Sequence, residues 1–239
     1  MVYRAYIKVL ALFLSLIWVE GLYASTHTFT DKLGRAITVN VPVKRAFIVI
    51  SYELIPAMNL WNQVAGVSRL AEDNNDLYKA IIRENPSLRK PTVGAGSDVN
   101  VEAVLKLNPD IVITWTYNPD TIRFLEQKGI KVIGIYPESL HELYEVIRMH
   151  GKLFGKEKKA EEVITEMEKI FNLIKKRISK IPSDKRKKAI HLGGKPTTVS
   201  CEVGVANDVI NIAGGINPAG SINSRNTDVS IEKNNSVES

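Results

Sequence analysis

The stretch DVNVEAVLKLNPDIVITW, residues 98–115, contains a complete helix-to-strand unit. Asn100 is a residue type that caps helices, and apolar residues follow it at helical spacing. Asn108 and Pro109 end this pattern, because the residue before a proline avoids the helical conformation. Residues 110–115 are then a short apolar run of the length of a buried strand. A helix followed directly by a buried strand is typical of α/β folds.

The same alternation extends along the chain on both sides of this stretch. Residues 45–51 and 64–68 are strand candidates before it, and KVIGIY, residues 131–136, is one after it. Helical patterns separate these runs, so we expect a parallel sheet with helices packed on it. The start of the mature chain, FTDKLGR at 29–35, has turn residues between two alternating runs and predicts a hairpin.

Residues 157–181 carry the longest periodic pattern of the chain. Apolar residues recur there at steps of three and four, which predicts one amphipathic helix of roughly 36 Å at 1.5 Å per residue. Pro182 ends the pattern. A new set of short strand and helix patterns then begins at residue 188, starting with KAIHL.

We therefore predict an α/β protein with two Rossmann-like lobes, each with a parallel-rich sheet, joined by one long helix. The N-terminal lobe is placed at 25–154, the connecting helix and linker at 155–187, and a partial C-terminal lobe at 188–239.

The first 24 residues have the composition of a secretory signal peptide. A basic start precedes VLALFLSLIWV, residues 9–19, and Ala24 offers a cleavage point. This run is shorter than the about 20 apolar residues of a membrane span. We expect export to the periplasm. The only cysteine is Cys201, so the sequence predicts neither an internal disulfide nor a lipid-anchored N-terminus near residue 24.

The positive charge is concentrated in two short clusters. The formal net charge is +6, and its surplus lies mainly at 175–177 and 185–188. No aromatic residues alternate with these cations, as a single-strand nucleic-acid binder would need. We interpret both clusters as solvated surface and expect no nucleic-acid partner.

The order of these motifs resembles the periplasmic substrate-binding proteins of ABC importers for iron–siderophore complexes, haem and vitamin B12. The resemblance covers nearly the whole mature chain up to Glu232. It implies two α/β lobes joined by one rigid helix, with a small-molecule ligand trapped between them, and no catalysis. It rests on the signal peptide, the hairpin, the long helix and three motifs: GAGSDVNVE at 94–102, LNPDIVI at 107–113 and LEQKGIKV at 125–132.

One pentapeptide occurs twice, as DVNVE at 98–102 and DVSIE at 228–232. The resemblance implies that a glutamate on each lobe, here Glu102 and Glu232, docks against arginines of a membrane permease. Two separated carboxylates would fix orientation as well as affinity. The alternative is that each glutamate only complements its own helix dipole.

The segment after Glu232 departs from the family pattern. The family continues there with a helix, a strand and a closing helix, whereas this chain reads KNNSVES. We expect the second lobe to be incomplete and the chain to be a C-terminally truncated member. A relic of the family that no longer binds ligand is therefore an alternative.

Candidate ligand contacts come from loops beyond the carboxyl ends of the strands, where α/β lobes bind ligands. Aromatic and arginine side chains there suit a hydrophobic, chelated or macrocyclic anion. Each aromatic alone has packing within its loop as the alternative. The candidates are Tyr52, Arg69, Trp115 and Tyr117 on the first lobe and Arg225 on the second. The expected cargo is a ferric siderophore, haem or corrinoid, with no resident cofactor or metal and a monomeric chain.

Two other classes of protein, a carrier of bare metal ions and an enzyme, fit the sequence less well. A protein that binds a bare metal ion needs converging histidine and carboxylate ligands, and His141 and His150 lie too far apart along one predicted helix to share an ion. An enzyme is not predicted, because no Walker A, G-x-S-x-G or paired His–Cys pattern occurs.

Overall fold

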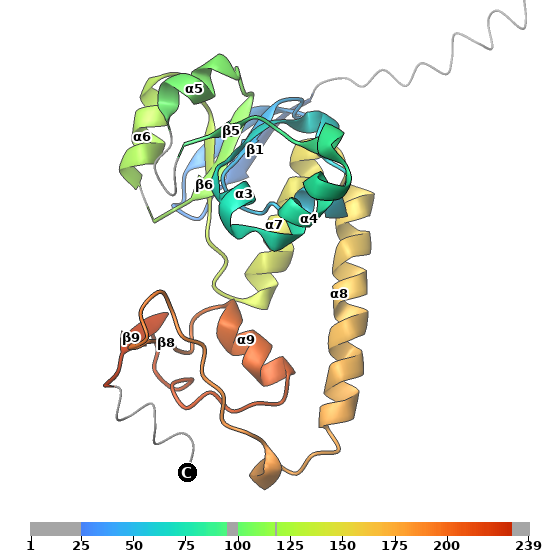
Figure 1. The fold of residues 1–239 in the computed structure, drawn as a ribbon, viewed down its shortest axis with the longest axis vertical. Helices are drawn as coiled ribbons and strands as arrows, with labels where there is room; N and C mark the ends of the chain where they lie inside the picture. The colour runs from blue at the N-terminus through green and yellow to red at the C-terminus, as the bar shows by residue number, and fades with distance from the viewer. Residues whose placement is uncertain (1–24, 95–99, 118, 231–239) are drawn as a thin grey trace, which may run out of the picture.

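The computed structural model describes residues 25–94, 100–117 and 119–230. The predicted signal peptide and Glu232 lie outside these ranges. Figure 1 shows an upper body with a sheet and most of the helices, a lower body of residues 183–230, and helix α8 running between them.

A five-stranded parallel sheet forms the centre of the upper body, in the order β5-β4-β3-β6-β7. Its strands are almost entirely apolar because helices and the hairpin cover both faces. They are β3 (Ala46–Ile48), β4 (Val64–Ser68), β5 (Thr92–Val93), β6 (Ile111–Trp115) and β7 (Val132–Ile135).

Alternate residues of one strand enter two separate cores. In β6, Val112 packs with residues of α5 (Val101–Lys106) and α6 (Pro119–Gln127). Ile111 and Ile113 point to the opposite face, toward the hairpin and α7 (Leu140–Phe154). This period of two places each strand between two apolar layers.

The N-terminal hairpin is formed by β1 (Ser25–Thr30) and β2 (Ala36–Val41), which pair antiparallel. Short helical segments cover the β4–β5 side of the sheet. These are α2 (Leu54–Ala57), the 3-10 turn at Trp61–Gln63, α3 (Leu70–Asn74), α4 (Asp76–Glu84) and the 3-10 turn at Pro86–Leu88.

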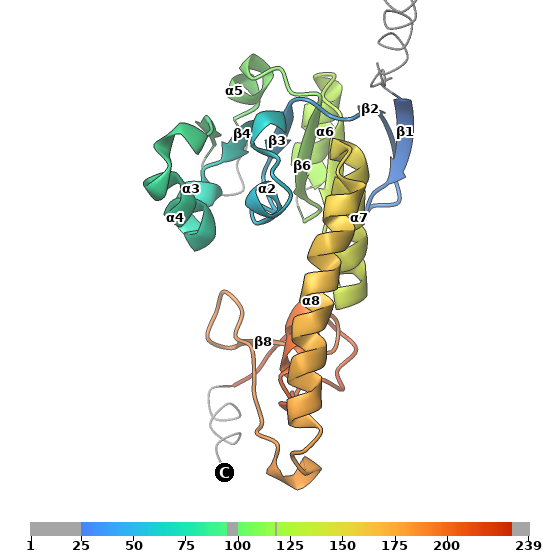
Figure 2. The same ribbon diagram turned by 90° about the vertical axis from the view of Figure 1, so that its right-hand side faces the viewer.

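Helix α8 (Glu157–Ile178) packs against α7 only in its first half. Its fully buried residues, Ala160 and Ile164, both lie there. Figures 1 and 2 agree that α8 runs beside α7 and then continues past it to the lower body, where it contacts α9. Further down, Ile170 and Leu173 are exposed.

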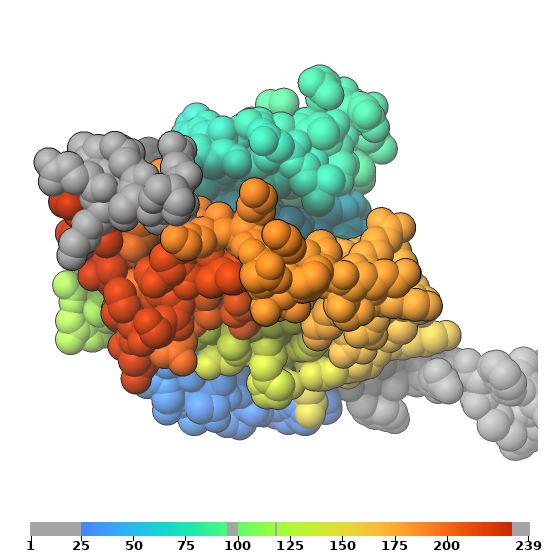
Figure 3. Space-filling model, turned by 90° about the horizontal axis from the view of Figure 1, so that it is seen from below, coloured from blue at the N-terminus to red at the C-terminus, as the bar shows by residue number. Residues whose placement is uncertain are grey.

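The lower body is small. It contains a 3-10 turn (Ser183–Lys185), β8 (Thr198–Ser200), α9 (Val205–Ile212) and β9 (Asn226–Asp228), with β8 and β9 paired antiparallel. Its core consists of Val199, Cys201 and Ala219, with Ile190 and Val229 against them. Seen from below, this region lies across the base of the molecule (Figure 3).

The α/β fold class and the parallel sheet of the first lobe are confirmed. Several predicted elements differ from the structure. The strand predicted at 45–51 is shorter and spans Ala46–Ile48. The sequence also predicts a parallel-rich sheet in the second lobe, but its described strands, β8 and β9, pair antiparallel. The long helix ends at Ile178 rather than residue 181. The predicted strand 188–192 forms only isolated bridges, from Lys188 to Ile216 and from Leu192 to Val199. Among the described helices, none is both long and apolar enough to cross a membrane.

Candidate functional site

A cavity of about 410 Å³ opens at the carboxyl ends of β3 and β6. Such an edge is where open parallel sheets bind ligands, and the volume lies in the range of small-molecule sites. Two of the five candidate ligand residues, Tyr52 and Trp115, line it. The other lining residues are Val49, Ile50, Ser51, Glu53, Leu70, Asn74, Asn75, Pro137, Leu143 and Val146.

Tyr52 contributes its ring rather than its hydroxyl. The chain turns sharply out of β3 at Ser51, which has a left-handed φ of 68°. The Tyr52 hydroxyl then points inward, where it shares a 2.5 Å hydrogen bond with the Ser68 hydroxyl and donates to the Val49 carbonyl. Burial raises the pKa of Tyr52 to about 12. The phenol therefore stays neutral, and its polar end is occupied within the lobe.

Three aromatic rings gather at the ends of β6 and β7. Trp115 packs edge-to-face with Tyr136 at 5.5 Å between centroids and lies 5.8 Å from Tyr117. Tyr117 is 54% exposed and does not line the cavity. Of these three described rings, only that of Trp115 lines the cavity.

Arg225 reaches this cluster from the lower body. Its guanidinium carbon lies 3.4 Å from the centre of the Tyr136 ring, a cation–π arrangement. Its Nη2 donates to Glu138 Oε1 at 2.5 Å. Arg225 is therefore occupied by first-lobe groups and does not line the cavity.

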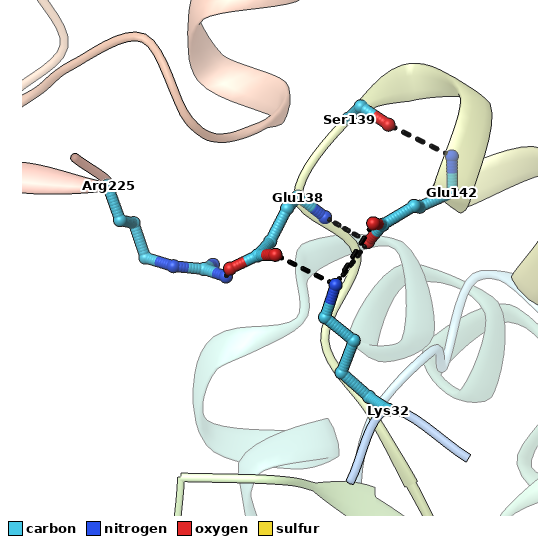
Figure 4. Close-up of polar contacts among 5 residues, drawn as sticks. All are labelled: Lys32, Glu138, Ser139, Glu142 and Arg225. Carbon is cyan, nitrogen blue, oxygen red and sulfur yellow. Dashed lines mark hydrogen bonds and ion pairs between the residues drawn. The ribbon is translucent and has the colours of Figure 1, made fainter. Parts of the chain in front are cut away.

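Glu138 is the centre of a polar network shown in Figure 4. Lys32 Nζ donates to Glu138 Oε2 at 2.8 Å and also to both carboxylate oxygens of Glu142. The Glu138 N–H donates to Glu142, and Ser139 caps α7 by accepting from the Glu142 N–H at 3.1 Å. Hydrogen bonds from Lys32 and Arg225 lower the pKa of Glu138. The network keeps this carboxylate ionised and oriented.

The hairpin turn supplies Lys32 because Asp31 fixes that turn to β7. Asp31 Oδ2 accepts from the Gly134 N–H at 3.1 Å, and the Lys32 N–H donates to the Gly134 carbonyl at 3.1 Å. Asp31 also binds Arg35 through an ion pair of 2.5 Å. The hairpin that follows the predicted cleavage point thus contributes Lys32 to the network around Glu138.

Arg69 lies apart from the cavity. It is exposed at the end of β4, and its Nε donates to the Gly94 carbonyl at 3.2 Å. The structure does not bring Arg69 together with the aromatic cluster in the residues it describes.

Glu102 lies on the outer surface, in the first turn of α5. Asn100 caps this helix by accepting from the Ala103 N–H at 3.0 Å. Glu102 is exposed and lines a shallow groove of about 450 Å³ with Asp120, Thr121 and Phe124. Its predicted partner in docking, Glu232, is outside the described residues.

The described residues 25–94, 100–117 and 119–230 contain no group of three or more His, Cys, Asp or Glu side chains arranged to hold a metal ion. His150 is fully buried in α7, where its Nδ1 bonds the Val146 carbonyl at 2.7 Å. It is a core residue of the helix.

Sequence reasoning missed Tyr136 and Glu138. Both follow β7, so the rule that directed attention to Tyr52, Trp115 and Tyr117 applies to them equally. No pattern in the sequence indicates that Arg225 contacts them.

The chain belongs to the periplasmic binding protein family, whose model matches residues 51–238. An uncharacterised ABC transporter substrate-binding lipoprotein of Bacillus subtilis, YvrC, is 26% identical over 167 residues, which are 67% of this chain and 50% of YvrC. The iron(3+)-hydroxamate-binding protein FhuD of the same organism is 30% identical over 115 residues, 47% of this chain and 36% of FhuD.

A solved structure has the same fold. Helicobacter pylori CeuE with Ni(II) bound superimposes with a TM-score of 0.72 at 25% identity, covering 88% of this chain and 69% of CeuE. The chain spans about half the length of YvrC and about a third of FhuD.

Proposed function

We propose that this protein is the substrate-binding component of an ABC importer and captures a metal chelate between its two lobes. The single observation that carries this proposal is the aromatic-lined cavity at the carboxyl edge of the sheet, with Arg225 of the second lobe reaching the adjacent ring of Tyr136. Family membership supports the transport role, and similarity to a ferric hydroxamate-binding protein supports the class of ligand.

The chemistry of the site fits a large, partly apolar ligand with an anionic group. Rings of Tyr52 and Trp115 supply flat apolar surface, and an arginine suits a carboxylate or an anionic chelate. The proposed ligand is a ferric siderophore, haem or corrinoid, without a resident cofactor. No bond is made or broken, so the protein acts as a carrier rather than an enzyme.

Delivery of the ligand to a membrane permease would use surface groups outside the cavity. We propose that the mature protein works in the periplasm as a monomer, with residues 1–24 as its signal peptide. Glu102 and Glu232 would dock on the arginines of an inner-membrane permease, and a carboxylate facing an arginine gives a strong, oriented contact. Because α8 is a single rigid connection, we expect small lobe movements rather than a wide hinge closure.

The domain division proposed for this mechanism is the one expected from the sequence, with lobes at 25–154 and 188–239 and the connecting helix and linker at 155–187. The cleft between the lobes would then include the carboxyl edge of the first-lobe sheet. Tyr52, Trp115, Tyr117, Arg69 and Arg225 are the proposed ligand contacts. The cavity favours Tyr52 and Trp115 as direct contacts and Arg69 as a peripheral one.

A tryptophan-fluorescence titration tests the proposal. The chain has three tryptophans, of which Trp61 and Trp115 remain after removal of residues 1–24. Trp61 is 8% exposed and packs against Tyr78, so the variant Trp61→Phe leaves Trp115 as the reporter in the cavity. The panel is a ferric hydroxamate, ferric enterobactin, haem, cobalamin and Ni²⁺.

Saturable quenching in Trp61→Phe by one chelate, and its loss in Trp115→Phe, would support the proposal. A response to Ni²⁺ alone would favour the second candidate, a protein that binds bare metal ions, for which the similarity to Ni(II)-bound CeuE is the supporting observation. A folded protein that responds to none of the panel would contradict the carrier function and favour a relic that no longer binds ligand.

A further inference from the structure

We propose that Glu138 and Arg225 form a latch between the two lobes, in which the Glu138 carboxylate occupies the place of an anionic group of the ligand. The latch itself stands on the described contacts, while its role as a ligand substitute rests on the proposed function. In this proposal, the ligand carries an anionic group that competes with the Glu138 carboxylate for Arg225.

The latch joins two separate parts of the fold. Glu138 follows β7 in the upper body, and Arg225 precedes β9 in the lower body, 87 positions later. The Arg225 carbonyl accepts from the Cys201 N–H at 2.9 Å, so its backbone is fixed to the core of the lower body. Movement of one lobe against the other must therefore stretch the contact between Glu138 and Arg225.

Glu138 is preorganised for this contact. Lys32 binds its second carboxylate oxygen, while the Glu138 N–H is bound by Glu142. The side chains of Glu138 and Arg225 are 37% and 25% exposed, so dissolved anions can reach the pair. Because Lys32 remains bound to Glu138 when Arg225 leaves, the released carboxylate keeps a cation partner.

The latch is directly connected to the cavity. Pro137, the residue between Tyr136 and Glu138, lines it. Trp115 also lines it and contacts the Tyr136 ring that Arg225 covers. A ligand against Trp115 would thus lie next to Arg225, whose planar donors suit a second carboxylate equally well.

One further polar contact between the lobes lies nearby. Asp208 Oδ2, in the first turn of α9, accepts from the Leu140 N–H at 2.6 Å. Because it involves neither the Glu138 nor the Arg225 side chain, we expect it to remain in Glu138→Gln. Loss of the latch should therefore loosen the lobes without separating them.

The first experiment measures the latch without any ligand. Spin labels at Lys106 and Lys195, exposed residues of the upper and lower bodies, report the distance between the lobes in a Cys201→Ala background of the mature chain. Glu138→Gln, Arg225→Gln and the double variant should broaden the distance distribution to the same extent. The matched control is Glu145→Gln, which removes an equal charge from α7 but breaks only the ion pair with Arg148. An unchanged distribution in Glu138→Gln would overturn the latch.

The second experiment measures competition by titrating haem, which carries two propionates, and a neutral ferric hydroxamate. Because one partly exposed ion pair is at stake, Glu138→Gln should bind haem about two- to fivefold more tightly than the parent. Arg225→Gln should bind it more weakly, and Glu145→Gln should match the parent. Affinity for the neutral hydroxamate should be unchanged in Glu138→Gln.

The outcomes separate this inference from the proposed function. Haem binding that is unaffected by Glu138→Gln, or binding of the neutral hydroxamate alone, would overturn the competition and leave the carrier function intact. Binding of neither probe by any variant would overturn the role of Glu138 as a ligand substitute and count against the carrier function. The distance measurement would still decide the latch.

Discussion

Asp31 Oδ2 and the Gly134 N–H are joined by a hydrogen bond of 3.1 Å, although the two residues lie 103 positions apart. This contact fixes the N-terminal hairpin to β7 and places Lys32 beside Glu138. A β-carbon at Gly134 would lie 2.8 Å from Thr116 Cγ2 and 3.2 Å from Asp31 Oδ2. Glycine is therefore required here by close approach.

We predict that Gly134→Ala destabilises the protein by about 1–3 kcal/mol, the usual cost of overpacking a buried position. Gly194→Ala is the matched control, because no atom lies within 4 Å of the β-carbon that it adds. Urea unfolding followed by circular dichroism measures both. Equal midpoints for the two variants would show that the hairpin moves away at little cost.

The second prediction concerns the buried imidazole of His150. Burial lowers its pKa to about 4, and its Nε2 is a buried atom without a hydrogen-bond partner. The unfolded chain takes up a proton on this histidine near its ordinary pKa of about 6.5, whereas the folded chain does not. Stability from this group is therefore complete above pH 6.5 and is lost as the pH falls toward 4.

This difference in the pKa of His150 between the unfolded and the folded chain corresponds to roughly 3 kcal/mol of unfolding free energy between pH 7.5 and pH 4. His150→Phe should remove that part of the pH dependence and keep a ring against Phe154, its neighbour at 6.1 Å. Urea midpoints at pH 4.5 and 7.5 measure the effect. His141→Phe, a change in the exposed first turn of the same helix, is the control and should keep the pH dependence of the parent. A parental pH profile in His150→Phe would mean that the carboxylates alone cause the acid sensitivity.

The third prediction separates docking from helix capping at Glu102. If Glu102 only complements the dipole of α5, Glu102→Gln should cost about 0.3–1 kcal/mol of stability and leave transport unchanged. If it docks on a permease arginine, stimulation of ATP hydrolysis by the permease in proteoliposomes should fall several-fold. Glu84→Gln, an exposed glutamate at the end of α4, is the control. Loss of stimulation in both variants would indicate a general charge effect rather than a docking residue.

The strands of the first lobe were predictable because burial on both faces leaves continuous apolar runs in the sequence. Val64–Ser68 forms the strand expected, and DIVITW contains β6. The segment 188–192 has a similar apolar pattern but forms only isolated bridges. A strand also needs a neighbouring strand to pair with, and the pattern of one segment carries no information about its neighbour.

The candidate site was predictable only in part, because the pattern of one segment does not show which distant segment lies next to it. Position after a strand identified Tyr52 and Trp115, and the same rule could have identified Tyr136 and Glu138. The contact of Arg225 with Glu138 depends on how α8 places one lobe against the other. That placement follows from packing along α7 and α8, which one sequence does not display.

The last prediction tests this placement directly. Gly151 of α7 faces Ala160 of α8 so closely that a β-carbon on Gly151 would lie 2.8 Å from the Ala160 β-carbon. Gly151→Ala gains up to about 1 kcal/mol of helix propensity. It costs about 1–3 kcal/mol from overpacking, so we expect net destabilisation and a displaced α8.

The swap variant Gly151→Ala with Ala160→Gly restores one methyl group to the crossing and should recover much of the loss. Thermal unfolding measures stability, and the label pair at residues 106 and 195 measures the position of the lower body. If α8 sets the spacing of the lobes, Gly151→Ala should shift the mean distance and the swap should return it. A stable Gly151→Ala with an unchanged distance would mean that contacts between the lobes, including Glu138 with Arg225, set the spacing instead.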